Sequence, residues 1–326
     1  MRGWGPCGPG SIPGSPTSKE DMKLKSPAVL LFFLSAIIGE VLSGATGPLT
    51  FFTNPIIFIF LTIFYGSGAL IIRELSFKWG KGWPTIVTLG VIYAIIEEGI
   101  LTKVFFDPTR QDLSPLVNYG SLFGVNWNFA LFLVIYHSVV SISVPIILTK
   151  LIFPENKSWI SGKTFKILSF LFIAEIILGS LIFPYKLLPL QYLLLISAII
   201  VLYRIAKKLP NNFSSASRLS SDRFIYFLGF VFVIGLFFSW IMTSLKILPI
   251  FIFAYLLALS FFAVKILLKF SNEKNFTNSK QLALASGILT PFILVSFIQE
   301  LIGRTGMSLI GIGMALFLFW IYKSKI

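Results

Sequence analysis

Long uninterrupted apolar runs are the feature that most limits what this chain can fold into. A helix needs about 20 apolar residues to cross the hydrocarbon core of a bilayer. Runs of this kind occur at about 27–44, 55–73, 84–106, 127–150, 166–184, 187–204, 223–245, 248–269, 281–301 and 305–322. The sequence therefore predicts an all-α, polytopic integral membrane protein with about ten transmembrane helices.

The composition agrees with this prediction and excludes several classes of site. Hydrophobic residues make up 56% of the chain and charged residues only 12%, whereas a soluble domain carries roughly 25% charged residues. The single cysteine, Cys7, excludes an intramolecular disulfide and a cysteine-based metal cluster. The single histidine, His137, excludes a zinc site with several histidines. We expect neither a metal ion nor a cofactor.

The net charge of +14 fits either a nucleic-acid surface or cytoplasmic loops that follow the positive-inside rule. When the predicted spans are laid out alternately, 22 of the 27 Lys and Arg residues fall in the two ends of the chain and in every second loop. The other five lie on the opposite side: Lys103, Arg110, Lys186, Lys246 and Arg304. This distribution predicts that both termini are cytoplasmic. It excludes a nucleic-acid partner, and the partner we expect is the lipid bilayer of the cell membrane.

The chain divides into a short N-terminal segment and one membrane domain. Residues 1–22 are rich in Gly, Pro and Ser, which predicts a disordered tail or a misassigned start, because Met22 precedes a basic flank and an apolar run. Residues 23–326 form a single predicted integral membrane domain. Within it, residues 27–155 hold most of the embedded acids and are expected to bear the site, and residues 156–326 are expected to be scaffold.

Ionisable residues inside a bilayer are costly, and each is therefore a candidate for function. Glu97 and Glu98 lie in the third predicted span and His137 lies in the fourth, at a similar depth in the outer half of the membrane. Because adjacent residues on an α-helix point about 100° apart, we expect one glutamate to act and the other to bond to a neighbouring helix. One glutamate would be a general base towards water held by His137.

Other polar residues are weaker candidates. Glu40 in the first predicted span, together with Asp107 and Asn126 in the long outer loop, is a possible addition to the polar site. Glu74, Glu175 and Glu300 are expected to be partners at helix ends or between helices. For Asp107 and Asn126 the alternative is an interfacial loop anchored by Tyr119 and Trp127. For Glu40, Glu97, Glu98 and His137 the alternative is that they pair with one another and fix helix packing.

Segments of this sequence resemble two groups of membrane proteins. YGSGALIIRE, KGW, EEG, FFDP, GVNW and IYHSVVSISVPI, within about residues 60–155, resemble a group of uncharacterised multi-pass membrane proteins of bacteria and archaea. More distantly, AIIEEGILTKVFF is similar to the Glu-Glu-x-x-x-Arg motif of the CAAX-processing endopeptidase and bacteriocin-immunity superfamily of intramembrane proteases. A Phe-x-x-x-His motif follows it in that superfamily.

The second resemblance implies an intramembrane hydrolase in which Glu97, Glu98 and His137 are catalytic. The sequence departs from the motifs at Thr102, which stands at the arginine position, and at Leu133, which stands at the phenylalanine position. The third motif of the superfamily needs a second histidine and has no counterpart here.

Three functions remain open from the sequence. The first is a divergent, protease-like intramembrane hydrolase that acts on a membrane-embedded substrate. The second is a proton-coupled transporter of a lipid or small solute, in which the same residues relay protons. The third is a non-catalytic subunit of a membrane assembly.

Overall fold

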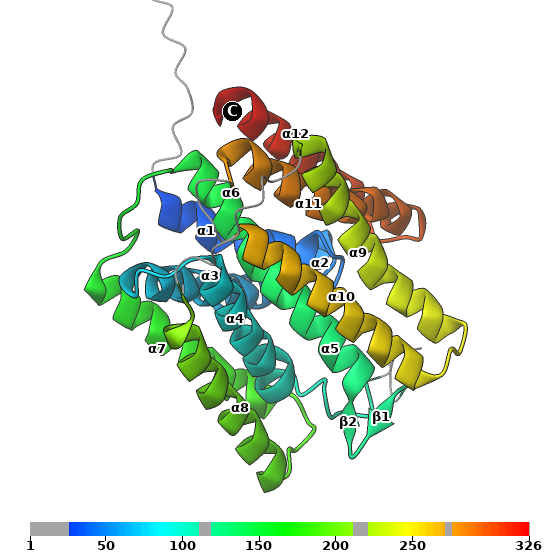
Figure 1. Ribbon diagram of the computed structural model, residues 1–326. Helices are drawn as coiled ribbons and strands as arrows, with labels where there is room; N and C mark the ends of the chain where they lie inside the picture. Colours follow the sequence, from blue (N-terminus) through cyan, green and yellow to red (C-terminus); the bar gives the residue numbers. More distant parts are fainter. Residues whose placement is uncertain (1–25, 111–118, 211–220, 271–275, 326) are drawn as a thin grey trace, which may run out of the picture.

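The computed structural model describes residues 26–110, 119–210, 221–270 and 276–325, so the predicted tail at residues 1–22 lies outside the described residues. In the described part, nine helical stretches are long and apolar enough to cross a membrane (Figure 1). They are α3 (Pro55–Lys78), α4 with η2 (Trp83–Leu101), α5 with η4 and α6 (Trp127–Ile152), α7 (Gly162–Ile182), α8 (Pro189–Lys208), α9 (Asp222–Ser244), α10 (Pro249–Phe270), α11 (Asn278–Leu301) and α12 (Met307–Lys325).

The first predicted span is shorter than the sequence suggested. The apolar helix runs from Pro27 to Val41 and consists of α1 (Pro27–Ala36) and the π-helical segment η1 (Ile37–Val41). The chain then turns at Gly44, whose φ of +80° suits glycine, and begins the short helix α2 (Pro48–Thr53). With this shorter helix added to the nine long ones, the predicted all-α polytopic fold is confirmed.

Among the described residues of the first half of the chain, three segments are π-helical. Besides η1, they are η2 (Ile95–Leu101), which continues α4 (Trp83–Ala94), and η4 (His137–Ser143), which joins α5 (Trp127–Tyr136) to α6 (Val144–Ile152). A π-helical turn closes its hydrogen bonds over five residues instead of four and is frequent at functional sites. Every candidate glutamate or histidine that the sequence placed in the outer half of the membrane lies on one of them.

The segment η4 has a local cause in the sequence. Pro145 lacks an N–H group, and in an α-helix its ring would clash with the carbonyl of Ser141. The hydroxyl of Ser143 donates to the carbonyl of Ser138 at 2.7 Å, which satisfies a backbone acceptor in the widened turn. The wider turn begins at His137 and therefore sets the direction of that side chain.

The central helix of the bundle is the one formed by α5, η4 and α6. In its most apolar stretch 83% of the residues are buried, compared with 17% in α7 and in α8. It is contacted by α1, α3, α4, α10 and α11, whereas α7 and α8 pack on the outside against α3, α4 and η2 (Figure 1). The predicted candidates are thus carried at the centre of the bundle and on the helices that surround it.

Glycines allow the helices around the central one to approach closely. A Cβ atom on Gly68 of α3 would lie 2.4 Å from the ring of Tyr93 on α4. A Cβ atom on Gly90 of α4 would lie 2.8 Å from the Cα atom of Ser138 on η4. Such contacts tolerate no side chain, so α3, α4 and η4 are held in register beside the candidate residues.

A two-stranded hairpin, β1 (Ser121–Leu122) and β2 (Val125–Asn126), leads directly into α5. Its two loop residues, Phe123 and Gly124, both have positive φ, as the tightest hairpin turns require. The backbone N–H of Asn126 donates to the carbonyl of Phe105, which ties the hairpin to the chain just after η2.

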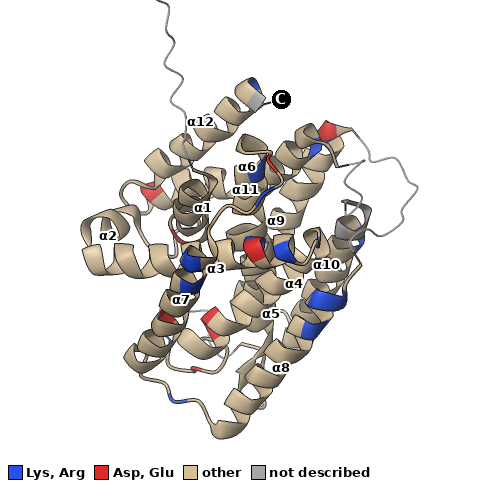
Figure 2. Cartoon of the chain, turned by 90° about the vertical axis from the view of Figure 1, so that its left-hand side faces the viewer, with Lys and Arg blue, Asp and Glu red and all other residues tan. Residues whose placement is uncertain are grey.

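Basic residues are unevenly distributed over the bundle. Figure 2 shows Lys and Arg grouped towards one end, including the C-terminal part of α8 and the N-terminal part of α7. This is the separation that the positive-inside pattern predicts, while the assignment of that end to the cytoplasm stays a prediction.

Candidate functional site

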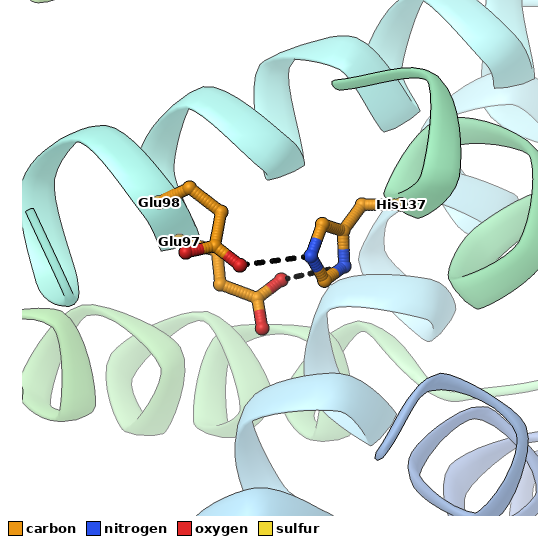
Figure 3. A group of neighbouring side chains, drawn as sticks. All are labelled: Glu97, Glu98 and His137. Atoms are coloured by element: carbon orange, nitrogen blue, oxygen red, sulfur yellow. Dashed lines mark hydrogen bonds and ion pairs between the residues drawn. The ribbon is translucent and has the colours of Figure 1, made fainter. Parts of the chain in front are cut away.

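The three principal candidates meet inside the bundle. Nε2 of His137 lies 2.9 Å from Oε1 of Glu98, and Nδ1 lies 3.1 Å from Oε2 of Glu97 (Figure 3). The three residues are 3%, 9% and 4% exposed, respectively. A buried imidazole is therefore held between two separate carboxylates, and we call these three residues the Glu–Glu–His cluster.

The geometry of η2 explains how two consecutive glutamates contact one ring. The expectation that only one of them could face a given partner was wrong, because it assumed the angle of about 100° between adjacent residues of an α-helix. In η2 the turn is wider, as the bond from the N–H of Thr102 to the carbonyl of Glu97 shows. Successive side chains are then closer in direction, and each carboxylate reaches a different nitrogen.

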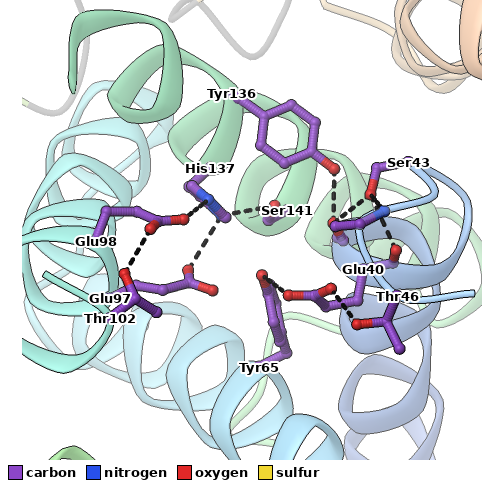
Figure 4. Close-up of polar contacts among 12 residues, drawn as sticks. Glu40, Ser43, Thr46, Tyr65, Glu97, Glu98, Thr102, Tyr136, His137 and Ser141 are labelled. Atoms are coloured by element: carbon purple, nitrogen blue, oxygen red, sulfur yellow. Dashed lines mark hydrogen bonds and ion pairs between the residues drawn. The ribbon is translucent and has the colours of Figure 1, made fainter. Parts of the chain in front are cut away.

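Hydroxyl groups hold two members of the cluster in place. Thr102 donates to Oε2 of Glu98 at 2.7 Å, and the hydroxyl of Ser141 lies 3.1 Å from Nδ1 of His137 (Figure 4). Each hydroxyl is four residues from the group that it contacts, on the same helical stretch. Residues four apart share a helix face, so this spacing is the signal by which sequence reasoning could have found Thr102 and Ser141.

Glu97 is held less completely than Glu98. Its Oε2 atom is buried and makes no hydrogen bond with the described residues, although it lies within ion-pair distance of His137. The hydroxyl of Tyr93, four residues earlier on α4, is directed towards Glu97 and also has no hydrogen-bond partner among the described residues. Glu97 is consequently the carboxylate whose Oε2 atom accepts no hydrogen bond from the described residues.

Glu40 extends the polar group towards α1. Its two carboxylate oxygens accept hydrogen bonds from Tyr65 at 3.0 Å and from Thr46 at 2.8 Å. Tyr65 lies between Glu40 and Glu97 (Figure 4), and Glu40 is within electrostatic range of the Glu–Glu–His cluster. The structure thus places Glu40 next to the cluster and makes Tyr65 its link, a residue that the sequence had suggested only for packing.

Asp107 and Asn126 lie in a separate place. They line a cavity of about 160 Å³ with Phe105 and Tyr185, and none of the three cluster residues lines it. Asp107 accepts hydrogen bonds from the N–H and hydroxyl of Thr109, and Asn126 caps α5 through Phe129. The outer-loop residues that were predicted to extend the site therefore line a neighbouring cavity instead.

Lys103 connects the outer end of η2 to α7. Its ammonium group donates to the carbonyls of Ser180 and Phe183 at 2.5 and 2.8 Å. Burial lowers the pKa of Lys103, and the nearby charge of Asp107 opposes that shift. These bonds fix the backbone that follows Thr102.

The remaining embedded acids have other surroundings. Glu74 pairs with Arg73 and accepts bonds from Ser158 and from the backbone of Trp159. Glu300 accepts bonds from the first turn of α12. Glu175 is 7% exposed, and its Oε2 atom has no partner among the described residues. The expected helix-end and interhelical roles fit the first two, and we have no physical account of Glu175.

The cluster offers donor atoms of the kind that bind metal ions. Glu97, Glu98 and His137 each supply one atom, and these atoms all lie within 4.8 Å of one another. The sequence excluded sites with several histidines or cysteines, but a site with one imidazole and two carboxylates does not need them.

Comparison with known proteins places the chain in a family. The sequence matches an uncharacterized membrane protein family over residues 29–323, which is most of its length. No curated protein and no solved structure matches it. The family match supports the first resemblance, to uncharacterised multi-pass membrane proteins, and gives no support to the resemblance to the CAAX-processing superfamily.

Proposed function

We propose that this chain, which belongs to an uncharacterized membrane protein family, is an intramembrane hydrolase. The family gives no activity to start from, so the proposal is based on the Glu–Glu–His cluster alone. The observation that carries the proposal is a buried imidazole whose two ring nitrogens lie 2.9 and 3.1 Å from separate carboxylates. Ionisable groups inside a membrane are expensive and are usually functional. A base next to an orienting histidine is the arrangement that activates water.

The three residues take different roles in this proposal. Glu97 is the general base, because no described residue donates a hydrogen bond to its Oε2 atom, which lies 3.1 Å from Nδ1 of His137 and can accept a proton from water. Glu98 is the positioning residue, since Thr102 and His137 occupy both of its oxygens. His137 polarises the attacked carbonyl or the water.

The proposed substrate is embedded in the membrane, and the protein resides in the cell membrane with both termini in the cytoplasm. In this proposal residues 27–155, which supply the cluster and Glu40, bear the site, and residues 156–326 provide scaffold. Orientation is tested in a Cys7→Ser background with a cysteine at exposed Lys157 or at exposed Lys186. An impermeant thiol reagent added to intact cells should label Lys186→Cys only, and the reverse pattern contradicts the orientation.

The hydrolase is tested by comparing wild type with Glu97→Gln and with the matched control Glu175→Gln. Glu175 is also a buried membrane glutamate but lies outside the cluster. Membranes of cells that express each protein are searched by mass spectrometry for new peptide ends and lipid fragments. We expect products with wild type and Glu175→Gln, and yields about 10²–10⁴-fold lower with folded Glu97→Gln. Equal yields from the three proteins, or none above an empty vector, would refute hydrolysis.

A proton-coupled transporter of a lipid or small solute is the second candidate, and a different observation favours it. Tyr65 bonds to Glu40 and lies beside Glu97, so protonatable groups follow one another from η1 to η4. Relays of this kind occur in pumps and transporters. In proteoliposomes that contain a pH-sensitive dye, Glu40→Gln would then abolish proton flux, whereas a hydrolase would carry none.

A subunit that serves only assembly is the remaining outcome of these experiments. In that case neither cleavage products nor proton flux depends on Glu97. Size-exclusion chromatography in detergent would instead show loss of folded protein when Glu97, Glu98 or His137 is replaced.

A further inference from the structure

The charges of the cluster do not balance. Glu97, Glu98 and the adjacent Glu40 are three carboxylates, and among the described residues the one basic side chain within ion-pair distance of them is His137. A buried carboxylate without compensation costs several kcal/mol or takes up a proton. Either protons or a cation must therefore supply the missing positive charge.

The donor atoms lie close together, and each carboxylate faces a different ring nitrogen of His137. The three atoms from Glu97, Glu98 and His137 lie within 4.8 Å of one another. Carboxylate oxygens and imidazole nitrogens bind zinc at about 2.0–2.2 Å, so two ligands of one ion lie at most about 4.4 Å apart. Small side-chain rotations therefore bring all three atoms to one ion.

A second observation is independent of the charge count. Oε2 of Glu97 and the hydroxyl oxygen of Tyr93 are both buried and make no hydrogen bond with a described residue. Tyr93 is 2% exposed and is directed at Glu97. Buried polar atoms in native proteins nearly always have a partner, and both of these atoms lie at the Glu–Glu–His cluster.

We propose that Glu97, Glu98 and His137 bind one divalent transition-metal ion. One imidazole and two carboxylates suit zinc or manganese, and three protein ligands leave a position open for a fourth group. The expectation of a protein without metal considered only clusters of histidines or cysteines, and this site needs neither. The inference rests on the proposed functional role of the cluster, but metal binding is measured without any substrate.

The experiment uses the full chain in detergent, carrying an affinity tag without histidine and Cys7→Ser, so that neither tag nor thiol binds metal. The protein is stripped with a chelator, and binding of Zn²⁺, Mn²⁺ and Mg²⁺ is measured by equilibrium dialysis and elemental analysis. We expect one Zn²⁺ or Mn²⁺ per chain. Glu97→Gln, Glu98→Gln and His137→Gln should each weaken binding at least 10-fold, whereas Glu175→Gln and Glu300→Gln should bind like wild type.

The outcomes separate this inference from the proposed hydrolase. Fewer than about 0.1 ions per chain, or unchanged binding by the folded cluster variants, overturns the metal site even where Glu97-dependent hydrolysis persists. Metal bound without hydrolysis keeps the site and overturns the enzyme. If the variants do not fold, X-ray absorption of the zinc-loaded protein decides: one imidazole among oxygen ligands supports the site, and oxygen ligands without an imidazole refute it.

Discussion

Two buried acidic sites in this protein differ in how the negative charge of their carboxylates is balanced. At the basic end of the bundle, Glu74 is fully buried and its charge is balanced by Arg73, 2.5 Å away. Arg73 also donates to the carbonyl of Lys157 and stacks on the ring of Trp159. Both charged groups at this site have partners, and their hydrogen bonds hold the loop after α6 against α3.

The Glu–Glu–His cluster lacks such a permanent cation. Its basic member is an imidazole, which can lose its charge, and Glu97 keeps an oxygen without a hydrogen bond. The comparison shows that burial of an acid is not by itself a sign of function. What distinguishes the cluster is that two buried carboxylates share one imidazole and that no described residue supplies them with a permanent cation.

The largest effect is expected at the fully paired site. Arg73→Met should lower the free energy of unfolding by about 3–5 kcal/mol, because it leaves Glu74 buried and unpaired. Unfolding in mixed detergent micelles measures the change. Lys78→Met, which removes an exposed charge on the same helix, should cost less than about 1 kcal/mol. Superimposable curves for Arg73→Met and wild type would contradict the structural role of the pair.

Removing one support of the cluster should have a smaller effect. Thr102→Val deletes the hydrogen bond to Glu98 and should cost about 1.5 kcal/mol, since a bond to a charged acceptor is lost. Thr102→Ser keeps the hydroxyl and should behave like wild type in the same unfolding assay. If both variants are equally destabilised, the methyl group rather than the bond supports η2.

The hydroxyl on the other side of the ring should matter less still. Ser141→Ala removes the contact with Nδ1 of His137 and should cost about 0.6 kcal/mol, the average for such bonds inside membranes. Ser244→Ala, at the exposed end of α9, is the matched control and should be neutral. A loss above about 2 kcal/mol would mean that Ser141 holds the helix and not merely the ring.

The smallest effect on stability is expected at Glu97. No described residue donates a hydrogen bond to its Oε2 atom, and the cost of burying its charge offsets the ion pair with His137. Glu97→Gln should therefore change the free energy of unfolding by less than about 0.5 kcal/mol while it reduces the proposed activity. Glu74→Gln, which breaks a complete pair, should cost clearly more in the same assay. Were Glu97→Gln as damaging as Arg73→Met, the contrast between the two sites would vanish and the cluster would be a packing element.

Several residues show how much of the candidate site could be predicted from the sequence. Glu97, Glu98 and His137 were identified because charged groups stand out in apolar runs, and two successive antiparallel spans bring them to one depth. Tyr93 and Ser141 were missed, although each lies four residues from a cluster member on the same helix. Asp107 and Asn126 were grouped with the cluster by loop position, but the chain folds them around a neighbouring cavity.

The approximate extent of the nine long membrane helices in the described residues followed from the sequence alone, because transfer of a segment into a bilayer depends on its own length and polarity. The tertiary structure alone decided that α1 stops short of a full crossing and that π-helical turns carry the polar residues. It also decided that both glutamates reach the same imidazole. These features depend on small differences in helix rotation and in the distance between helices. Packing between helices sets both, and the hydropathy of a single segment does not encode them.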